Sequence, residues 1–429
     1  MKRRAALLVV ALITGLVALP GAAAVAHTAP GDDPIRAAEY WLDGARVDEA
    51  WEVTRGAGVT VAIIDTGIAR VPGVFDGAVA GGTDVSGIGS SDGRTPLGAI
   101  DGDHGTWVAS LVGARPNADG TGMIGVAPEA QLLSVSVSFG ASAAVPFTQQ
   151  VADGIRWAVD NGADIINLSF TTNTLSWDPS WDDAFLYAFE HDVVVIVAAG
   201  NRESGTTIVG APATIPGVLT VAGVDQTGLA SQSASTQGIT IGISAPSEGL
   251  LGVSANGVLV RWRGTSGAAP IVAGVAALVR AAHPELDAAN VINRIIRSAI
   301  PASTGESLPD PLYGYGLVDA AAAVTDSVPL VTTNPMGDLA EWIRLYRRAE
   351  SLVPDGSETA APVVLPPLPA AEPPTAAASP WLPNEETLLY GTIPLIALTV
   401  PGILVGLGVT AVARRVRSAS IRAPKQSDI

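Results

Sequence analysis

Short runs of apolar residues without a polar face recur through the middle of the chain. Residues 59–64 read V-T-V-A-I-I, a β-branched run with no alternation, which is typical of a central parallel strand covered on both faces. Four similar runs follow, at residues 132–137, 164–168, 193–198 and 218–224. We therefore expect several buried strands in one sheet.

Helical spacing of apolar residues separates these runs. It is found at residues 149–161 and 182–191, and residues 266–282 form a longer, alanine-rich stretch that is apolar almost all round. The last pattern predicts a buried helix. Alternating strands and helices predict an α/β domain with a mostly parallel sheet, whose active site would lie at the carboxyl ends of the strands.

The first 26 residues have the features of a secretory signal peptide. A basic start (residues 2–4) precedes an apolar stretch (residues 5–19), and A-V-A at residues 24–26 supplies a cleavage site between small residues. Cleavage there would make His27 the first residue of the mature chain. An uncleaved N-terminal anchor is the alternative.

Residues 388–412 are 25 residues without a charge, and a membrane span needs about 20 apolar residues. Two glutamates precede this run, and five basic residues lie in the tail at residues 413–429. By the positive-inside rule, we expect one transmembrane helix with the main body outside the membrane and the tail in the cytoplasm. The alternative, a buried core helix, is disfavoured by the length of the charge-free run.

Residues 351–387 precede this span and are rich in proline, with nine prolines in residues 351–384. This composition predicts an extended, semi-rigid stalk rather than a proline-rich ligand for another domain. Residues 27–330 remain as one large globular domain, and residues 331–350 are expected to add a short amphipathic helix.

Composition and charge exclude several classes of protein. The chain is 48% hydrophobic and 15% charged, which excludes a disordered protein. Its net charge is -17, and eight of its 24 basic residues lie in the two end segments, so we expect no nucleic acid partner. The absence of cysteine excludes disulfides, a thiolate metal site and a cysteine nucleophile.

Three short motifs carry residues suited to nucleophilic catalysis. Asp65 ends the first predicted strand before a glycine turn, where it would orient an imidazole or only cap the turn. His104 begins a predicted helix of about ten residues. Ser266 stands at the start of the buried helix, where it would act as a nucleophile or only as an N-cap. Small neighbours and free first-turn amides suit the nucleophile interpretation, because the amides can bind an oxyanion.

A fourth segment places Asn201 just beyond another predicted strand. Taken together, the order Asp, His, Ser is the order of the subtilisin triad. The chain resembles the subtilisin family (subtilases) over about residues 48–320, in the stretches V-A-I-I-D-T-G-I, D-H-G-T-W-V-A-S, G-V-A-P-E-A-Q-L, I-I-N-L-S-F, A-A-G-N and G-T-S-G-A-A-P.

This resemblance implies a subtilisin-like three-layer domain and a serine endopeptidase acting on polypeptides without a cofactor. By motif, Asp65 orients His104, His104 is the general base, Ser266 is the nucleophile and Asn201 is the oxyanion donor. The residues implied in substrate binding form two segments, Ser169, Phe170 and Thr171, and Ala198, Ala199 and Gly200.

The sequence departs from the family at three places. Trp107 stands where a second histidine is common, and Gly267 stands where a bulky residue is common. Residues 169–172 read S-F-T-T where S-L-G-G is common. The first two changes alter what surrounds the triad and remove no catalytic group. The third places larger residues in the wall of the specificity pocket.

The short lead-in before Asp65, the stalk and the single span resemble the mycosins, the membrane-anchored subtilases of type VII secretion systems. The lack of cysteine departs from that group. The resemblance implies a type VII secretion complex as a partner, with catalysis as the main role or with the domain as a scaffold and catalysis secondary or absent. A general nutritional protease is disfavoured by the anchor.

No metal is expected in the chemistry, because no cluster of histidine and acidic residues has catalytic-metal spacing. Some subtilases carry structural calcium. The loop residues Asp101, Asp103 and Asp119 are interpreted as a solvated surface or a local turn rather than as calcium ligands.

Overall fold

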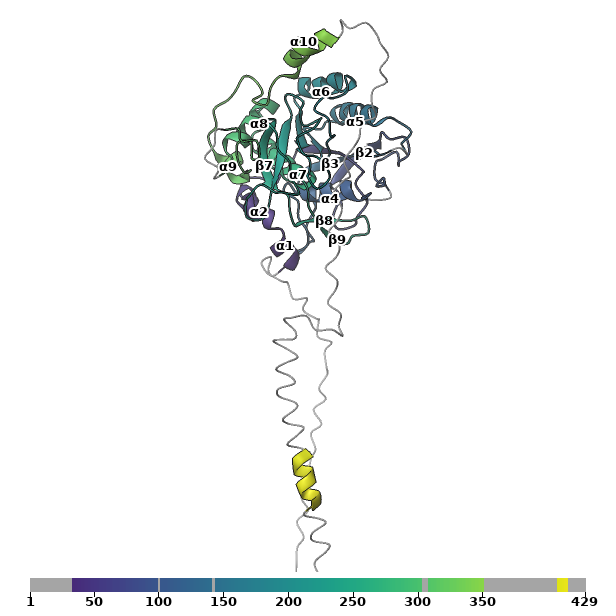
Figure 1. Ribbon diagram of the computed structural model, residues 1–429, viewed down its shortest axis with the longest axis vertical. Coiled ribbons are helices and arrows are strands. Elements are labelled where there is room, and N and C mark those ends of the chain that lie inside the picture. Colours follow the sequence, from purple (N-terminus) through teal and green to yellow (C-terminus); the bar gives the residue numbers. More distant parts are fainter. Residues whose placement is uncertain (1–32, 99–100, 141–142, 303–307, 351–406, 416–429) are drawn as a thin grey trace, which may run out of the picture.

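Seven parallel strands form the centre of the structure, a computed structural model that describes residues 33–98, 101–140, 143–302, 308–350 and 407–415 (Figure 1). The strands of this sheet are β1 (Thr60–Asp65), β2 (Val79–Asp84), β3 (Gln131–Ser136), β4 (Ile165–Leu168), β5 (Val194–Ala198), β6 (Leu219–Val224) and β7 (Ile241–Pro246). Their order is β2-β3-β1-β4-β5-β6-β7, and every neighbouring pair is parallel. The predicted α/β class with a mostly parallel sheet is confirmed.

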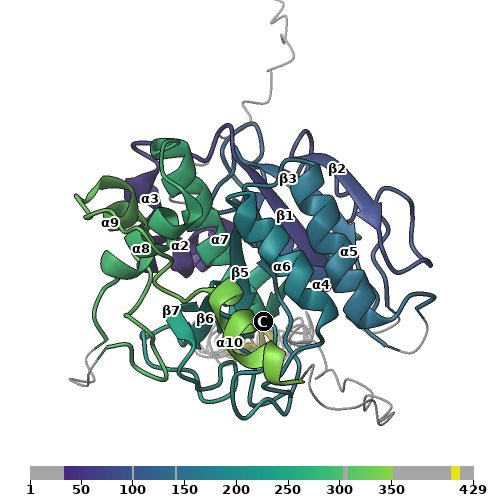
Figure 2. The ribbon, with the colours of Figure 1, turned by 90° about the horizontal axis from the view of Figure 1, so that it is seen from above.

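Helices cover both faces of the sheet (Figure 2). They are α4 (His104–Gly113), α5 (Phe147–Asp160), α6 (Ser180–Glu190), α7 (Thr265–Ala282), α8 (Ala288–Arg297), α9 (Ala320–Thr325) and α10 (Leu339–Glu350). Alternate side chains of β1 point to opposite faces: Val61 and Ile63 join the core formed with α4, α7, α8 and α9, whereas Ala62 and Ile64 join the core formed with α5, α6 and the start of α10. The result is a three-layer domain, as expected.

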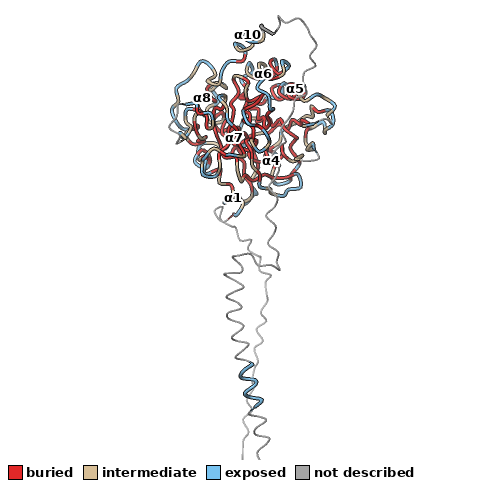
Figure 3. The backbone as a smooth tube through the Cα atoms, viewed as in Figure 1, coloured by how far each residue is buried: buried red, intermediate tan, exposed pale blue. Residues whose placement is uncertain are grey.

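Among the most deeply buried elements are strands β1 and β3–β7 of the sheet and the helices α4 and α7 (Figure 3). Every residue of α7 from Thr265 to Arg280 is buried, as its all-round apolar sequence predicts. In the part of the chain that the structure describes, α7 is also the one helix long and apolar enough to cross a membrane, but 83% of it is buried inside the protein. It is therefore a core helix.

The predicted segments at the two ends of the chain lie largely outside the described residues. These are the signal peptide (1–26), the stalk (351–387), residues 388–406 of the span and residues 416–429 of the tail. Residues 407–415, where the predicted span passes into the tail, are helical and exposed.

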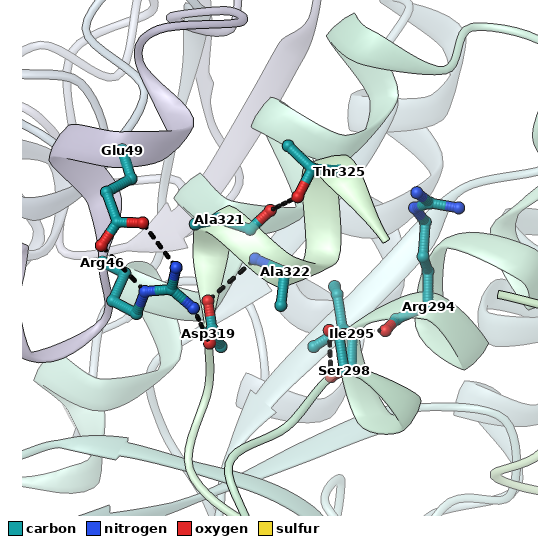
Figure 4. Close-up of polar contacts among 9 residues, drawn as sticks. All are labelled: Arg46, Glu49, Arg294, Ile295, Ser298, Asp319, Ala321, Ala322 and Thr325. Atoms are coloured by element: carbon teal, nitrogen blue, oxygen red, sulfur yellow. Dashed lines mark hydrogen bonds and ion pairs between the residues drawn. The ribbon is translucent and has the colours of Figure 1, made fainter. Parts of the chain in front are cut away.

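Three short helices, α1 (Pro34–Ala38), α2 (Tyr40–Gly44) and α3 (Val47–Ala50), form an N-terminal segment that packs on the sheet domain. Trp41 is fully buried in the main core. Arg46, between α2 and α3, donates to Glu49 and to Asp319 at the start of α9, the latter at 2.7 Å (Figure 4). Asp319 in turn caps α9 by accepting from the Ala322 amide. The first and last parts of the domain are thus tied together.

A small antiparallel hairpin, β8 (Leu250–Val253) and β9 (Leu259–Trp262), joins β7 to α7. Strand β8 packs on α4. At the other end of the domain, α10 packs on α6, where Trp342 stacks against Trp177 with ring centroids 4.4 Å apart.

A buried carboxyl group fastens the N-terminal segment to the domain. Glu39 accepts a hydrogen bond from the Ile124 amide at 2.9 Å, and its side chain has no exposed surface. Burial raises the pKa of Glu39 from 4.5 to about 8. Arg36 lies 3.4 Å away and opposes the shift, but it is partly exposed and burial dominates. Glu39 is therefore protonated in the folded protein at neutral pH.

This raised pKa makes stability depend on pH. Between pH 4.5 and about 8, Glu39 keeps its proton in the folded state but has lost it in the unfolded state. The free energy of unfolding should therefore fall as the pH rises through that range. The slope should be at most about 1.4 kcal/mol for each pH unit. Glu39→Gln keeps the acceptor oxygen and cannot ionise, so it should flatten this decline. Urea unfolding of the wild type and of Glu39→Gln at pH 5, 7 and 9 measures this dependence. Equal slopes in the two proteins would contradict the raised pKa of Glu39.

Candidate active site

The candidate site lies where the direction of the sheet connections reverses. Strands β1 and β4 are neighbours, but the chain leaves β1 toward β2 on one side and leaves β4 toward β5 on the other. In parallel sheets such a switch point opens a crevice beyond the carboxyl ends of the strands. Asp65 is the last residue of β1, and Ser169 follows the last residue of β4.

Asp65 and His104 form a buried pair. Nδ1 of His104, the first residue of α4, lies 2.8 Å from Oδ1 of Asp65, and neither side chain has exposed surface. A carboxylate at Nδ1 favours the tautomer with its proton on that nitrogen, which leaves the Nε2 lone pair available as a base. Nε2 is buried and makes no hydrogen bond within the described part of the chain. Oδ1 of Asp65 also accepts from the Thr66 amide, so the carboxylate contacts the imidazole and the turn at the same time.

Two glycines allow α4 to come this close to β1. Gly67 turns the chain after Asp65 with φ of +105°. Gly105 packs directly on that turn, where a Cβ would stand 2.7 Å from the Gly67 carbonyl oxygen. The Gly105 amide donates to the Thr66 hydroxyl at 2.8 Å. Gly67 and Gly105 thus allow Asp65 and His104 to come within hydrogen-bonding distance of each other.

Ser266 is the second residue of α7. The N-cap of this helix is Gly264, so the alternative that Ser266 is only an N-cap is wrong. The Ser266 carbonyl oxygen accepts from the Ser169 hydroxyl at 2.9 Å, and Ser169 accepts from the Asn167 amide group. These contacts fix the first turn of α7 against the end of β4.

Asn201 lies beside the same turn. Its Oδ1 accepts from the Thr265 amide at 2.7 Å and from the Thr265 hydroxyl at 3.1 Å. Its Nδ2 group donates to none of the residues that the structure describes. Because the oxygen is held by Thr265, the NH₂ group is the free end of the amide, and it can stabilise negative charge near Ser266.

The segments expected to contact substrate are buried and closely packed. Thr171 donates to the Gly210 carbonyl at 2.9 Å, and the Gly200 amide donates to the Thr265 hydroxyl at 2.9 Å. The methyl groups of Thr171 and Thr206 lie against Gly200, where any Cβ would collide with them. Phe170 packs with Phe139 and Phe147 rather than standing free. Ala198 and Ala199 are almost fully buried.

Two acidic residues lie close to the start of α4. Asp101 has a φ of +58°, unusual for a residue other than glycine. Burial raises the pKa of Asp101, and the nearby His104 acts in the opposite direction. Asp103 is the N-cap position of α4 and makes no side-chain capping bond. In the described ranges no three histidine, aspartate or glutamate residues converge as a metal site.

The structure also places residues at the site that the sequence patterns do not single out. Thr265 holds Asn201, and Trp262 packs against His104 with ring centroids 5.6 Å apart. Thr265 lies inside the G-T-S motif next to Ser266, so the sequence could have indicated that it belongs to the site. Trp262 carries no local signal, because its partners are distant in sequence.

The chain has a parallel sheet with a buried Asp–His pair at its switch point. Comparison with known proteins shows to which family of proteins it belongs. The subtilase family model matches residues 56–316, and the chain belongs to this family of serine endopeptidases. Mycosins are among its similar relatives. Mycosin-4 of Mycobacterium tuberculosis is 34% identical over 332 residues, which are 67% of this chain and 70% of that protein. Subtilisin DY of Bacillus licheniformis is 35% identical, over 63% of this chain and 92% of its own.

Solved structures of mycosin proteases share the fold. The MycP3 protease from the type VII (ESX-3) secretion system has a TM-score of 0.57 and 32% identity, covering 72% of this chain and 91% of its own. MycP1 with the N-terminal propeptide removed has a TM-score of 0.58 and 30% identity, covering 68% and 98%.

Replacing Asn201 tests its expected role. Asn201→Ala removes the donor and should lower kcat about 10²–10³-fold with little change in KM, the loss found when the corresponding donor of subtilisin is removed. Asn201→Asp keeps an oxygen that accepts from Thr265 and should be equally impaired, because it places a negative charge toward the oxyanion. Steady-state kinetics on a peptide substrate measures both. An unchanged kcat in Asn201→Ala would exclude Asn201 as the oxyanion donor.

Proposed function

We propose that this chain is a membrane-anchored serine endopeptidase that cuts exported or surface polypeptides and works with a type VII secretion complex. Asp65, His104 and Ser266 form the catalytic triad, and Asn201 is the oxyanion donor. The observation that carries the proposal is the buried Asp65–His104 hydrogen bond of 2.8 Å, at the switch point where Asn201 and Ser266 also lie.

The chemistry follows from this arrangement. His104 takes the hydroxyl proton of Ser266 at Nε2 while the serine oxygen attacks the scissile carbonyl carbon. Asp65 stabilises the imidazolium that forms. The oxyanion of the tetrahedral intermediate is met by the Asn201 NH₂ group and by the Ser266 amide, which as a first-turn amide has no partner inside α7. His104 then protonates the leaving amine, and a water repeats the cycle to hydrolyse the acyl-enzyme.

Substrate would pair with the backbone that starts at Ser169 and place one side chain between residues 169–171 and 198–200. Thr171 stands where the family commonly has glycine, and its methyl group packs against Gly200. We therefore expect a shallow primary pocket that favours small side chains.

The secretion setting rests on similarity and on the sequence of the chain ends. Mycosins are among the relatives, and the MycP3 relative belongs to a type VII system. The signal peptide, stalk and charge-flanked span are sequence predictions that place the peptidase domain outside the membrane. A domain that only supports the secretion complex is the second candidate, and the serine substitution below distinguishes it.

Ser266→Ala should abolish peptide cleavage and labelling by a fluorophosphonate probe, because it removes the attacking oxygen. The fold should be retained, since Ser266 does not cap α7 and its neighbours Thr265 and Gly267 keep their contacts. Melting temperature and probe labelling are measured on the same preparation, with Ser298→Ala as a control for loss of a hydroxyl in another helix-end position. Export in cells carrying Ser266→Ala, where a full deletion blocks it, would show that support of the complex is the essential role.

The topology is tested on intact cells from which the wall has been removed. External protease should release a soluble domain by cutting within residues 351–384, and an epitope after residue 425 should stay protected. The reason is the asymmetry of charge about residues 388–412. A domain that is protected while the C-terminal epitope is digested would reverse the predicted orientation.

A further inference from the structure

Two tryptophans enclose the imidazole of His104. The Trp262 ring centroid lies 5.6 Å from that of the imidazole at an interplanar angle of 78°, and the Trp107 centroid lies 6.2 Å away at 62°. The two indoles also contact each other, with centroids 5.6 Å apart. Trp262 has no exposed surface and Trp107 is 4% exposed. The imidazole is therefore held in an edge-to-face aromatic cluster, a favourable geometry for aromatic pairs.

The hairpin of β8 and β9 fixes this cluster. Nε1 of Trp262 donates to the Leu251 carbonyl at 3.1 Å, and Nε1 of Trp107 donates to the Ser254 hydroxyl at 2.9 Å. Gly252, between these acceptors, leaves space for both indoles, since a Cβ there would stand 2.7 Å from the Trp107 Cβ and 2.9 Å from Trp262 Nε1. Each indole is thus fixed both by ring contact and by a hydrogen bond to the hairpin.

The indole of Trp262 also lies next to Gly267, the residue that follows Ser266. A Cβ on Gly267 would lie 3.3 Å and 3.4 Å from two carbons of the Trp262 ring and would collide with Leu250 Cδ1. A larger residue at position 267 has no space while Leu250 and Trp262 keep their places. Gly267 and Trp262 therefore form a matched pair, and the Trp262 ring packs both on the His104 imidazole and on the first turn of α7.

We propose that Trp262 is a positioning residue that fixes the plane of the His104 imidazole so that Nε2 faces Ser266. The bond to Asp65 holds one ring nitrogen but leaves the ring free to tilt about that point. An indole packed on the ring removes that freedom and keeps water away from it. Since positioning errors of about 1 Å can cost about 100-fold in rate, this restraint bears directly on catalysis. The inference deepens the proposed function and rests on it.

The first test compares Trp262 with a matched buried tryptophan. Trp181 of α6 is 1% exposed and its Nε1 donates to the Thr148 carbonyl at 2.8 Å, but it lies in the layer on the other face of the sheet. Trp262→Leu and Trp181→Leu should lose similar stability. Only Trp262→Leu should lose kcat, about 10- to 100-fold, with KM unchanged because a fully buried indole does not touch substrate. Trp262→Phe keeps a ring and should lose less than about tenfold.

The second test changes Gly267, the residue that packs against the Trp262 ring. Gly267→Met would displace both Leu250 and Trp262 and should reproduce the kcat loss of Trp262→Leu. Gly267→Ala collides mainly with Leu250 Cδ1, so adding Leu250→Val, which removes that carbon, should restore kcat. Gly267→Ala with Leu250→Val is thus the control for the collision with Leu250, which Gly267→Met also makes.

A third readout does not depend on activity. The proton on His104 Nδ1 should give a downfield NMR resonance in the full-length protein in detergent, assigned by its loss in His104→Ala. This resonance should broaden or shift in Trp262→Leu and stay in place in Trp181→Leu. If wild type neither cleaves nor labels, the proposed function fails and this resonance alone decides the inference. If the wild type is active and both leucine variants keep kcat, or the resonance is unchanged in Trp262→Leu, the positioning role is wrong.

Discussion

The structure depends on the burial of α7. Its sequence is apolar on all sides, so it is stable only if neighbours cover every side. The sheet covers one side through β4, β5, β6 and β7, and α4, α8 and α9 cover the others. Burial on this scale excludes sliding or rotation of the helix, because protein cores are close-packed. Its first turn, with Ser266, therefore has a fixed place, and the loops around it are arranged to meet that turn.

Each element that reaches this turn does so by a short-range contact. Ser169 binds the Ser266 carbonyl, and Asn201 binds Thr265. His104 arrives with α4, which itself packs on α7. The residues of the site are thus held against the first turn of α7, which has a fixed position. A rigid fold supplies in this way the preorganisation that catalysis requires.

The sequence patterns located the strands whose stability is visible locally. The runs that became β1, β3, β4, β5 and β6 are continuous and apolar, because parallel strands are covered on both faces. Strand β2 was missed: it reads V-A-G-G-T-D and lies largely unburied at the edge of the sheet. Strand β7, I-G-I-S-A-P, is buried but interrupted by glycine and serine, so its pattern is not that of a strand. The short N-terminal helices gain their stability from contacts with distant parts of the core.

The candidate catalytic residues were predictable in type and order, but their supports were not. Asp65, His104 and Ser266 stand in recognisable local motifs, whereas the contact of Asn201 with Thr265 spans 64 residues of sequence and that of Trp107 with Ser254 spans 147. A pattern within one segment carries no information about such pairs. The collision that excludes a side chain at Gly267 likewise appears only when the hairpin is in place.

The attachment of α10 has a mechanical consequence. Arg347 pairs with Asp182 of α6 at 2.8 Å and lies over the rings of Trp177 and Trp342. A tether pulling on the chain after residue 350 would load this contact first, in shear between α10 and α6. That contact belongs to the layer on the opposite face of the sheet from α4 and α7. If residues 351–387 form the proposed stalk, tension on it would load the layer of α6 and α10 before the layer that carries His104 and Ser266.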